Sequence, residues 1–126
     1  MPFSSYSDNA LIDHLLGPST FTKPANKYVA LYIGDPMGSG TEVSTSGSAY
    51  VRRSATFTVS TNIAVNAADL EWPIATSSWG TITHAAIFDA STAGNMLVSA
   101  ALLVSKTVTA GDIIRIPASD LTVTLT

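Results

Sequence analysis

The stretch Ala75-Thr76-Ser77-Ser78-Trp79-Gly80-Thr81-Ile82-Thr83-His84-Ala85-Ala86-Ile87-Phe88-Asp89 decides the fold of this chain. From Thr81 to Asp89, small polar and apolar residues alternate with a period close to two, which predicts a β-strand. The turn-forming run that follows ends at Gly94-Asn95, so the strand should enter a hairpin. The return strand, Met96 to Val104, is nearly all apolar or small. This composition predicts a hairpin in the middle of a packed sheet.

Further strands are predicted on both sides of this hairpin. Tyr28 to Ile33 is a run of aromatic and β-branched residues, and the Gly- and Ser-rich stretch Met37 to Ala49 should form a long polar loop. Tyr50 to Val59 recovers an extended pattern, with Val51, Ala55, Phe57 and Val59 on the expected core face and Tyr50 on the opposite face. At the end of the chain, the alternation Leu121 to Thr126 should turn Leu121, Val123 and Leu125 inward.

About seven or eight short strands joined by turns are typical of an all-β fold, an antiparallel two-sheet sandwich or a jelly-roll-like barrel. At 126 residues, the chain is long enough to bury a core of its own. We expect residues 25–126 to form this single β-sandwich domain.

The N-terminal residues predict the one helix of the chain. Ser7 or Asp8 can cap a helix over Asn9 to Leu16, and Gly17-Pro18 should end it with glycine in a left-handed conformation. Leu11, Ile12, Leu15 and Leu16 form one apolar stripe. Because a helix of about two turns is unstable alone in water, the stripe must dock on something. Residues 1–24 are therefore expected to be an N-terminal arm that serves as a docking element.

Composition excludes several classes of function. The net charge is −3 with only 12% charged residues, which leaves no basic field for nucleic acid. No apolar run approaches the roughly 20 residues needed to span a bilayer, and the N-terminus lacks the pattern of a signal peptide. We therefore expect the protein to be made in the cytoplasm and to stay there or leave it inside an assembly. The chain has no cysteine, so disulfides and thiolate metal sites are excluded.

Some polar residues have a functional interpretation, but each has a simpler structural one. Asp69 and Glu71 share a strand face and could hold a cation, yet a solvated outer face explains them as well. His84 has no obvious nucleophile or carboxylate partner and is expected to pack by hydrogen bonding. Of Arg52 and Arg53, one should pair with a carboxylate and the other reach solvent or a partner. With two histidines and no cysteine, we predict no catalytic, cofactor or metal site.

The large aromatic residues of the central region are expected in the core. Trp72, Trp79 and Phe88 lie where aromatic side chains close the ends of sheets. The alternative is that Trp72 and Trp79 are exposed and stack on a sugar, as in carbohydrate-binding modules. In that case a cell-surface glycan would be a partner.

Residues along nearly the whole chain carry a resemblance to a known family. They are Phe3-Ser4-x-Tyr6, Tyr28-Val29-Ala30-Leu31, Gly40-Thr41-Glu42-Val43, Tyr50-Val51-Arg52, Phe57, Trp72-Pro73, Trp79-Gly80-Thr81-Ile82-Thr83-His84, Ile87-Phe88-Asp89-Ala90, Gly94-Asn95-Met96-Leu97, Ala110-Gly111-Asp112 and Leu121-Thr122-Val123. With these residues the chain resembles small bacteriophage virion proteins described as phage tail fibre proteins.

The resemblance implies a non-enzymatic virion structural protein of tail fibre or appendage type, present in many copies. Its partners would be other copies of itself, with a trimer favoured, and other virion proteins. The alternatives are a capsid decoration (cement) protein and a carbohydrate-binding β-sandwich module. The candidate partner-binding residues are the apolar side chains of the N-terminal arm, Phe3, Tyr6, Leu11, Ile12, Leu15 and Leu16. The alternative is that the arm folds back onto its own sheet.

Overall fold

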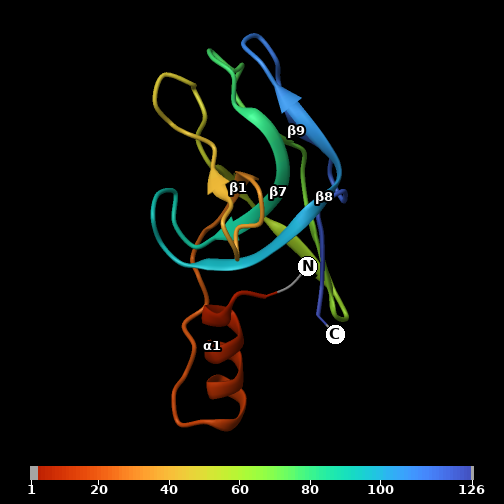
Figure 1. The fold of residues 1–126 in the computed structure, drawn as a ribbon. Coiled ribbons are helices and arrows are strands. Elements are labelled where there is room, and N and C mark those ends of the chain that lie inside the picture. Colours follow the sequence, from red (N-terminus) through yellow and green to blue (C-terminus); the bar gives the residue numbers. More distant parts are fainter. Residues whose placement is uncertain (1–2, 126) are drawn as a thin grey trace.

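The computed structural model describes residues 3–125, which form antiparallel sheets preceded by a helix (Figure 1). The helix is α1 (Ser5–Leu16). The strands within the described residues are β1 (Lys27–Ile33), β2 (Thr41–Glu42), β3 (Arg53–Ala55), β4 (Phe57–Ser60), β5 (Ile63–Asn66), β6 (Leu70–Glu71), β7 (Gly80–Phe88), β8 (Met96–Val108), β9 (Arg115–Ile116) and β10 (Thr122–Thr124). The predicted all-β class with one short N-terminal helix is confirmed, although ten strands replace the seven or eight expected.

The strands form three antiparallel sheets and not the two that were predicted. The largest has the order β2-β1-β7-β8, with β3 also paired to β1; the others are β10-β5-β4 and β6-β9. A third sheet arises because Leu70–Glu71 and Arg115–Ile116 pair only with each other among the described residues. The arrangement is still sandwich-like, since the five-stranded sheet packs one face against both smaller sheets.

The core lies between the five-stranded sheet and the two smaller ones. Val29 of β1 and Ile82 of β7 are fully buried there, together with Trp72 at 1% exposure and Trp79 at 4%. Trp79 Nε1 donates to the Ser48 carbonyl at 2.8 Å. A second, smaller cluster, which includes Phe88 at 7% exposure, packs on the other face of the sheet.

The central hairpin forms as the alternation predicts, but its position in the sheet was predicted wrongly. β7 is central and pairs with β1 on one side and β8 on the other. β8 lies at the edge of the described sheet, so Leu103 and Val104 are exposed. The register shifts between Ile82↔Lys106 and His84↔Ala101, so β8 carries extra residues that bulge outward. Such a bulge blunts an edge against unwanted pairing.

The predicted single strand from Tyr50 to Val59 is wrong, because the chain changes sheets within it. Arg53–Ala55 pairs with β1, whereas Phe57–Ser60 pairs with β5 in a different sheet. The predicted core face is therefore wrong at both ends of this stretch. Tyr50, expected opposite the core face, is 1% exposed, and Val59, expected on it, is 69% exposed.

The predicted polar loop from Met37 to Ala49 is partly ordered. It contains β2, which pairs with the end of β1, and it buries Val43 and Ser48. The turn before β2 brings two glycine backbones together: a Cβ placed on Gly40 would lie 2.4 Å from the Gly34 carbonyl carbon. The last strand was also predicted too long. Leu121 and Val123 are buried, but Leu125 is 53% exposed because pairing with β5 ends at Thr124, and Thr126 lies outside the described residues.

The helix begins four residues earlier than predicted, because the N-cap is Ser4 and neither Ser7 nor Asp8. The Ser7 N–H donates to Ser4 Oγ at 3.2 Å. Gly17 ends the helix in an extended conformation, with φ −100° and ψ −174°, and not in the left-handed one expected. Pro18 explains this, since a proline disfavours helical conformations in the preceding residue. Among the described residues, no helix has the length and apolar character that crossing a bilayer would need.

Candidate functional site

The start of the N-terminal arm is fixed to the edge of the five-stranded sheet. The Ser4 N–H donates to the Leu97 carbonyl of β8 at 2.9 Å, and Ser4 Oγ donates to the Met96 carbonyl. Phe3 adds a single antiparallel bridge to Val98. The same serine therefore caps α1 and anchors it to β8. Met1 and Pro2 of the predicted arm lie outside the described residues.

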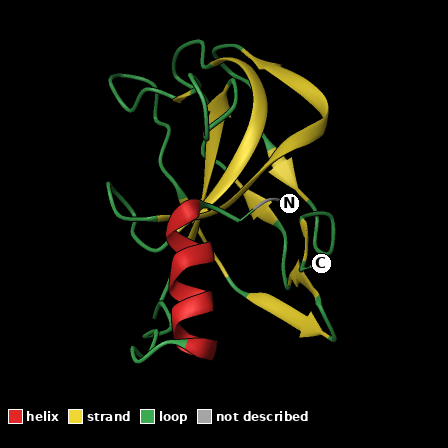
Figure 2. Ribbon diagram, turned by 60° about the horizontal axis from the view of Figure 1, so that its bottom comes forward, coloured by secondary structure: helices red, strands yellow, loops and turns green. Residues whose placement is uncertain are grey.

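The segment between α1 and β1 returns along the helix. Figure 1 shows α1 extending below the strands with this connector, residues 17–26, beside it. The rings of Tyr6 and Phe21 meet edge to face, 6.4 Å between centroids, and the Phe21 N–H donates to His14 Nδ1 at 3.0 Å. Figure 2 shows the helix from a second direction, with its upper end against the strands. The arm is thus held by its own connector and by its first residues.

The far half of α1 presents large aliphatic side chains to solvent. Ile12 is 56% exposed, Leu15 73% and Leu16 81%. We call these three residues the aliphatic stripe. Leu11, the fourth member of the stripe predicted from the sequence, is half-buried and faces the strands. Of the other predicted partner-binding residues, Tyr6 is 40% exposed and Phe3 is half-buried.

A largely apolar groove of about 390 Å³ lies between the arm and the strands. Its walls come from α1, the connector and strands of two sheets. The lining includes Leu11, Phe21, Phe57, Val59, Lys23 and Lys27. We call this the arm groove. Sequence reasoning missed it, because Phe57 and Val59 were expected on the core face of a single strand from Tyr50 to Val59.

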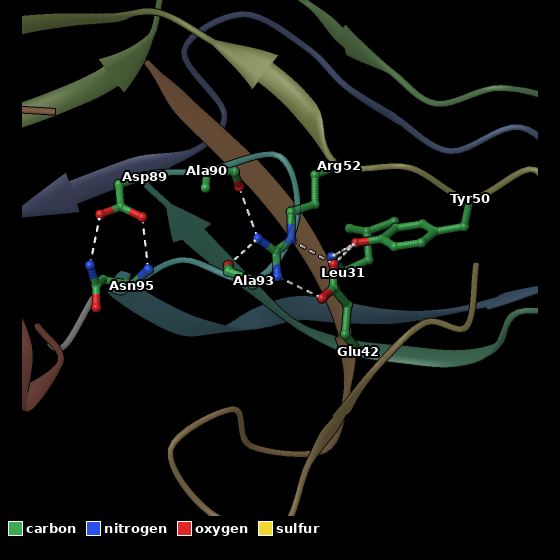
Figure 3. A network of polar contacts seen from close by, with 8 residues as sticks. All are labelled: Leu31, Glu42, Tyr50, Arg52, Asp89, Ala90, Ala93 and Asn95. Atoms are coloured by element: carbon green, nitrogen blue, oxygen red, sulfur yellow. Dashed lines mark hydrogen bonds and ion pairs between the residues drawn. The ribbon is translucent and has the colours of Figure 1, made fainter. Parts of the chain in front are cut away.

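A buried polar network holds the loops at the opposite side of the sheet (Figure 3). Arg52 donates from Nε and Nη2 to both carboxylate oxygens of Glu42, each at 2.9 Å, and from Nη1 to the carbonyls of Ala90 and Ala93. The guanidinium carbon lies 3.8 Å from the centroid of the Phe88 ring. The predicted pairing of one arginine with a carboxylate is confirmed, and Arg53 is exposed.

Tyr50 extends this network into the core. Its hydroxyl donates to Glu42 Oε2 at 2.6 Å and accepts the Leu31 N–H at 3.0 Å. Burial, and after it the hydrogen bond to Glu42, raise the pKa of Tyr50 well above its ordinary value. Tyr50 is therefore a permanent donor. The network joins β1, β2 and the β7–β8 turn by hydrogen bonds. Its role is therefore to hold these segments together.

The other candidate residues lie apart from one another. Trp72 and Trp79 are buried, so neither presents a ring face on which a sugar could stack. Asp69 is exposed and pairs with Arg115 at 2.9 Å. His84 Nδ1 lies 2.8 Å from the hydroxyl of its neighbour Thr83. Within residues 3–125, no three histidine or carboxylate side chains gather in a way that could hold a metal ion.

Comparison with known proteins identifies a family. A family model described as podophage GP4 fiber I protein gp80 matches residues 2–124, which is nearly the whole chain. No curated protein matches the chain.

Proposed function

We propose that this chain, which belongs to the podophage GP4 fiber I protein gp80 family, acts as a non-enzymatic structural subunit assembled in several copies on the phage particle. Membership of that family makes the chain a fibre-type structural appendage protein of the virion. The family description names a fibre, which favours an appendage over the alternative role in capsid decoration.

The aliphatic stripe of α1 is the observation that carries this proposal. Three large aliphatic side chains, each more than half exposed, lie together on one short helix. Apolar surface gathered in this way marks interaction sites on soluble proteins. We therefore assign residues 1–24 as the docking arm and residues 25–126 as the body that the arm joins to its neighbours.

The composition supports self-association. Only 12% of the residues are charged, so little electrostatic repulsion opposes contact between copies. A helix of 12 residues also gains stability from every contact a neighbour adds, because alone it is at the lower limit of stability in water. The assembly we expect is a trimer.

Two measurements test the proposal. Sedimentation velocity on the full-length protein should give three times the mass of one chain. Antibody labelling of intact phage particles, viewed by electron microscopy, should place the protein on the tail appendages. Label confined to the capsid would assign the decoration role instead. A single-chain mass at every concentration would contradict self-assembly.

A further inference from the structure

The aliphatic stripe of α1 shares its helix face with a carboxylate, that of Asp8. Asp8, Ile12, Leu15 and Leu16 fall at i, i+4, i+7 and i+8, which places them on one face of the helix. Asp8 is exposed in the first turn, and the neighbouring face of α1, with Ser7 and Leu11, lines the chain's own arm groove. The stripe residues are not among those that line this groove, and their exposure leaves them open to a partner.

The arm groove has the complementary character. Its lining is mainly apolar, and its charged members are Lys23 and Lys27, with no carboxylate among the lining residues. Within residues 3–125, neither lysine forms an ion pair, and neither does Asp8. Each copy thus carries one apolar helix face with a negative charge and one apolar groove with positive charges.

We infer that the arm groove receives the aliphatic stripe of α1 from a neighbouring copy of this chain. This inference rests on the proposed multi-copy function and names the contact through which copies join. Ile12, Leu15 and Leu16 would fill the groove, and Asp8 would face Lys23 or Lys27. A groove of about 390 Å³ has room for a few large aliphatic side chains.

The contact is head-to-tail, because the helix face and the groove are different surfaces of one chain. Heterologous contacts of this kind form a closed ring when the rotation between copies closes, and an open filament when it does not. A second copy is favoured as the occupant over another protein, because every copy supplies both surfaces in equal number and with opposite charge.

Point variants of the full-length protein test the contact by sedimentation velocity. Leu15→Glu changes the stripe and Val59→Glu changes the groove; both residues are mostly exposed, at 73% and 69%. Each variant should raise the dissociation constant of the assembly by roughly 30-fold or more, the effect of losing one buried aliphatic side chain. Val104→Glu, at 67% exposure on β8, is the matched control and should leave assembly unchanged.

Charge reversal tests the orientation of the helix in the groove. Asp8→Lys and Lys23→Glu should each weaken assembly, and the doubly substituted chain should recover it. Asp8 also stabilises the first turn of α1, but Lys23→Glu cannot repair that effect. Recovery in the double variant therefore reports the contact itself. If Lys23→Glu has no effect alone and gives no recovery, Lys27→Glu replaces it, and the absence of recovery with both lysines overturns the inferred orientation.

Mixing the Leu15→Glu and Val59→Glu chains distinguishes the helix–groove contact from other ways in which copies could assemble. The Leu15→Glu chain keeps an intact groove and the Val59→Glu chain an intact helix, so each pair in a mixture can form one helix–groove contact. Because one contact is weak, the heterodimer should appear only at high protein concentration, at which either variant alone should remain a monomer. A trimer that survives both substitutions would refute the helix–groove contact and leave the multi-copy function standing. A wild-type monomer would refute both. Assembly only after adding another virion protein would also overturn the inference, because the occupant would then not be a second copy.

Discussion

Replacing Arg52 with methionine should destabilise the protein strongly, although the residue lies outside the arm. Its guanidinium makes two 2.9 Å contacts to Glu42 and donates to two backbone carbonyls, and its side chain is only 7% exposed. Methionine keeps an aliphatic side chain over the Phe88 ring but removes every one of these donors. Glu42, at 23% exposure, would remain as a half-buried carboxylate without its cation.

The size of the effect follows from burial. Breaking a buried ion pair by removing one partner costs about 3–5 kcal/mol, and the partial exposure of Glu42 favours the lower end. We expect a loss of about 3 kcal/mol in the free energy of unfolding, which corresponds to a drop of roughly 10 °C in Tm for a chain of this size. Urea denaturation and a thermal melt both measure it.

Arg115→Met provides the matched control. The Arg115–Asp69 distance is also 2.9 Å, but the two side chains are 55% and 51% exposed, so its loss should cost about 1 kcal/mol or less. Replacing Glu42 and Arg52 together should cost less than the sum of the single replacements, because no charge is left unpaired. Equal losses for Arg52→Met and Arg115→Met would refute the argument from burial.

Three other predictions concern the body of the domain. Trp79→Ala should lower the free energy of unfolding by about 3–5 kcal/mol in urea denaturation, since Trp79 is 4% exposed; an unchanged midpoint would contradict its place in the core. Gly40→Ala should cost about 1–3 kcal/mol, because a Cβ there would lie 2.4 Å from the rigid backbone of Gly34; a melt equal to wild type would mean that the turn rearranges freely. The Asn95 N–H lowers the pKa of Asp89, so Asp89 should stabilise the fold above its unfolded pKa and lose this contribution as pH falls through the folded value. The stability difference between wild type and Asp89→Asn should therefore shrink below about pH 4, and a difference constant with pH would refute this linkage.

The elements predicted well from the sequence are those whose pattern is local. One face of β7 packs against the main core and the other against the smaller cluster. The residues of β7 therefore alternate with period two, and this alternation can be recognised within the strand itself. The helix was predicted over Asn9 to Leu16 from its apolar stripe, but its start was missed, since several serines before Asn9 can cap a helix. Only the anchoring of Ser4 on β8, a contact 92 residues away in sequence, selects one of them.

The elements predicted poorly depend on partners distant in the chain. The alternation between Tyr50 and Val59 indicates an extended backbone. It does not reveal that the first part of this stretch pairs with β1 and the second part with β5. Tyr50 is buried because the Leu31 N–H and Glu42 satisfy its hydroxyl, which no local pattern reveals. The apolar run of β8 suggested a central strand, yet its outward bulge exposes Leu103.

Of the two surfaces in the proposed contact, only the aliphatic stripe could be predicted from the sequence. The stripe on α1 follows from the spacing of Ile12, Leu15 and Leu16, since helical periodicity needs no tertiary information. The arm groove does not follow, because the connector meets β4, β5 and β10 only in the folded chain. The sequence could therefore suggest that the arm docks, but not the surface on which it docks.

The energetics of this contact favour a closed ring over a stable dimer. Burying the three stripe residues, which are partly covered already, would contribute roughly 3–6 kcal/mol. Association of two copies costs an estimated 4–15 kcal/mol in lost translational and rotational freedom, so one helix–groove contact alone is weak. A ring of three copies makes three such contacts for two association steps. We therefore expect cooperative assembly in which the dimer is scarce, with monomer and trimer as the species present at equilibrium.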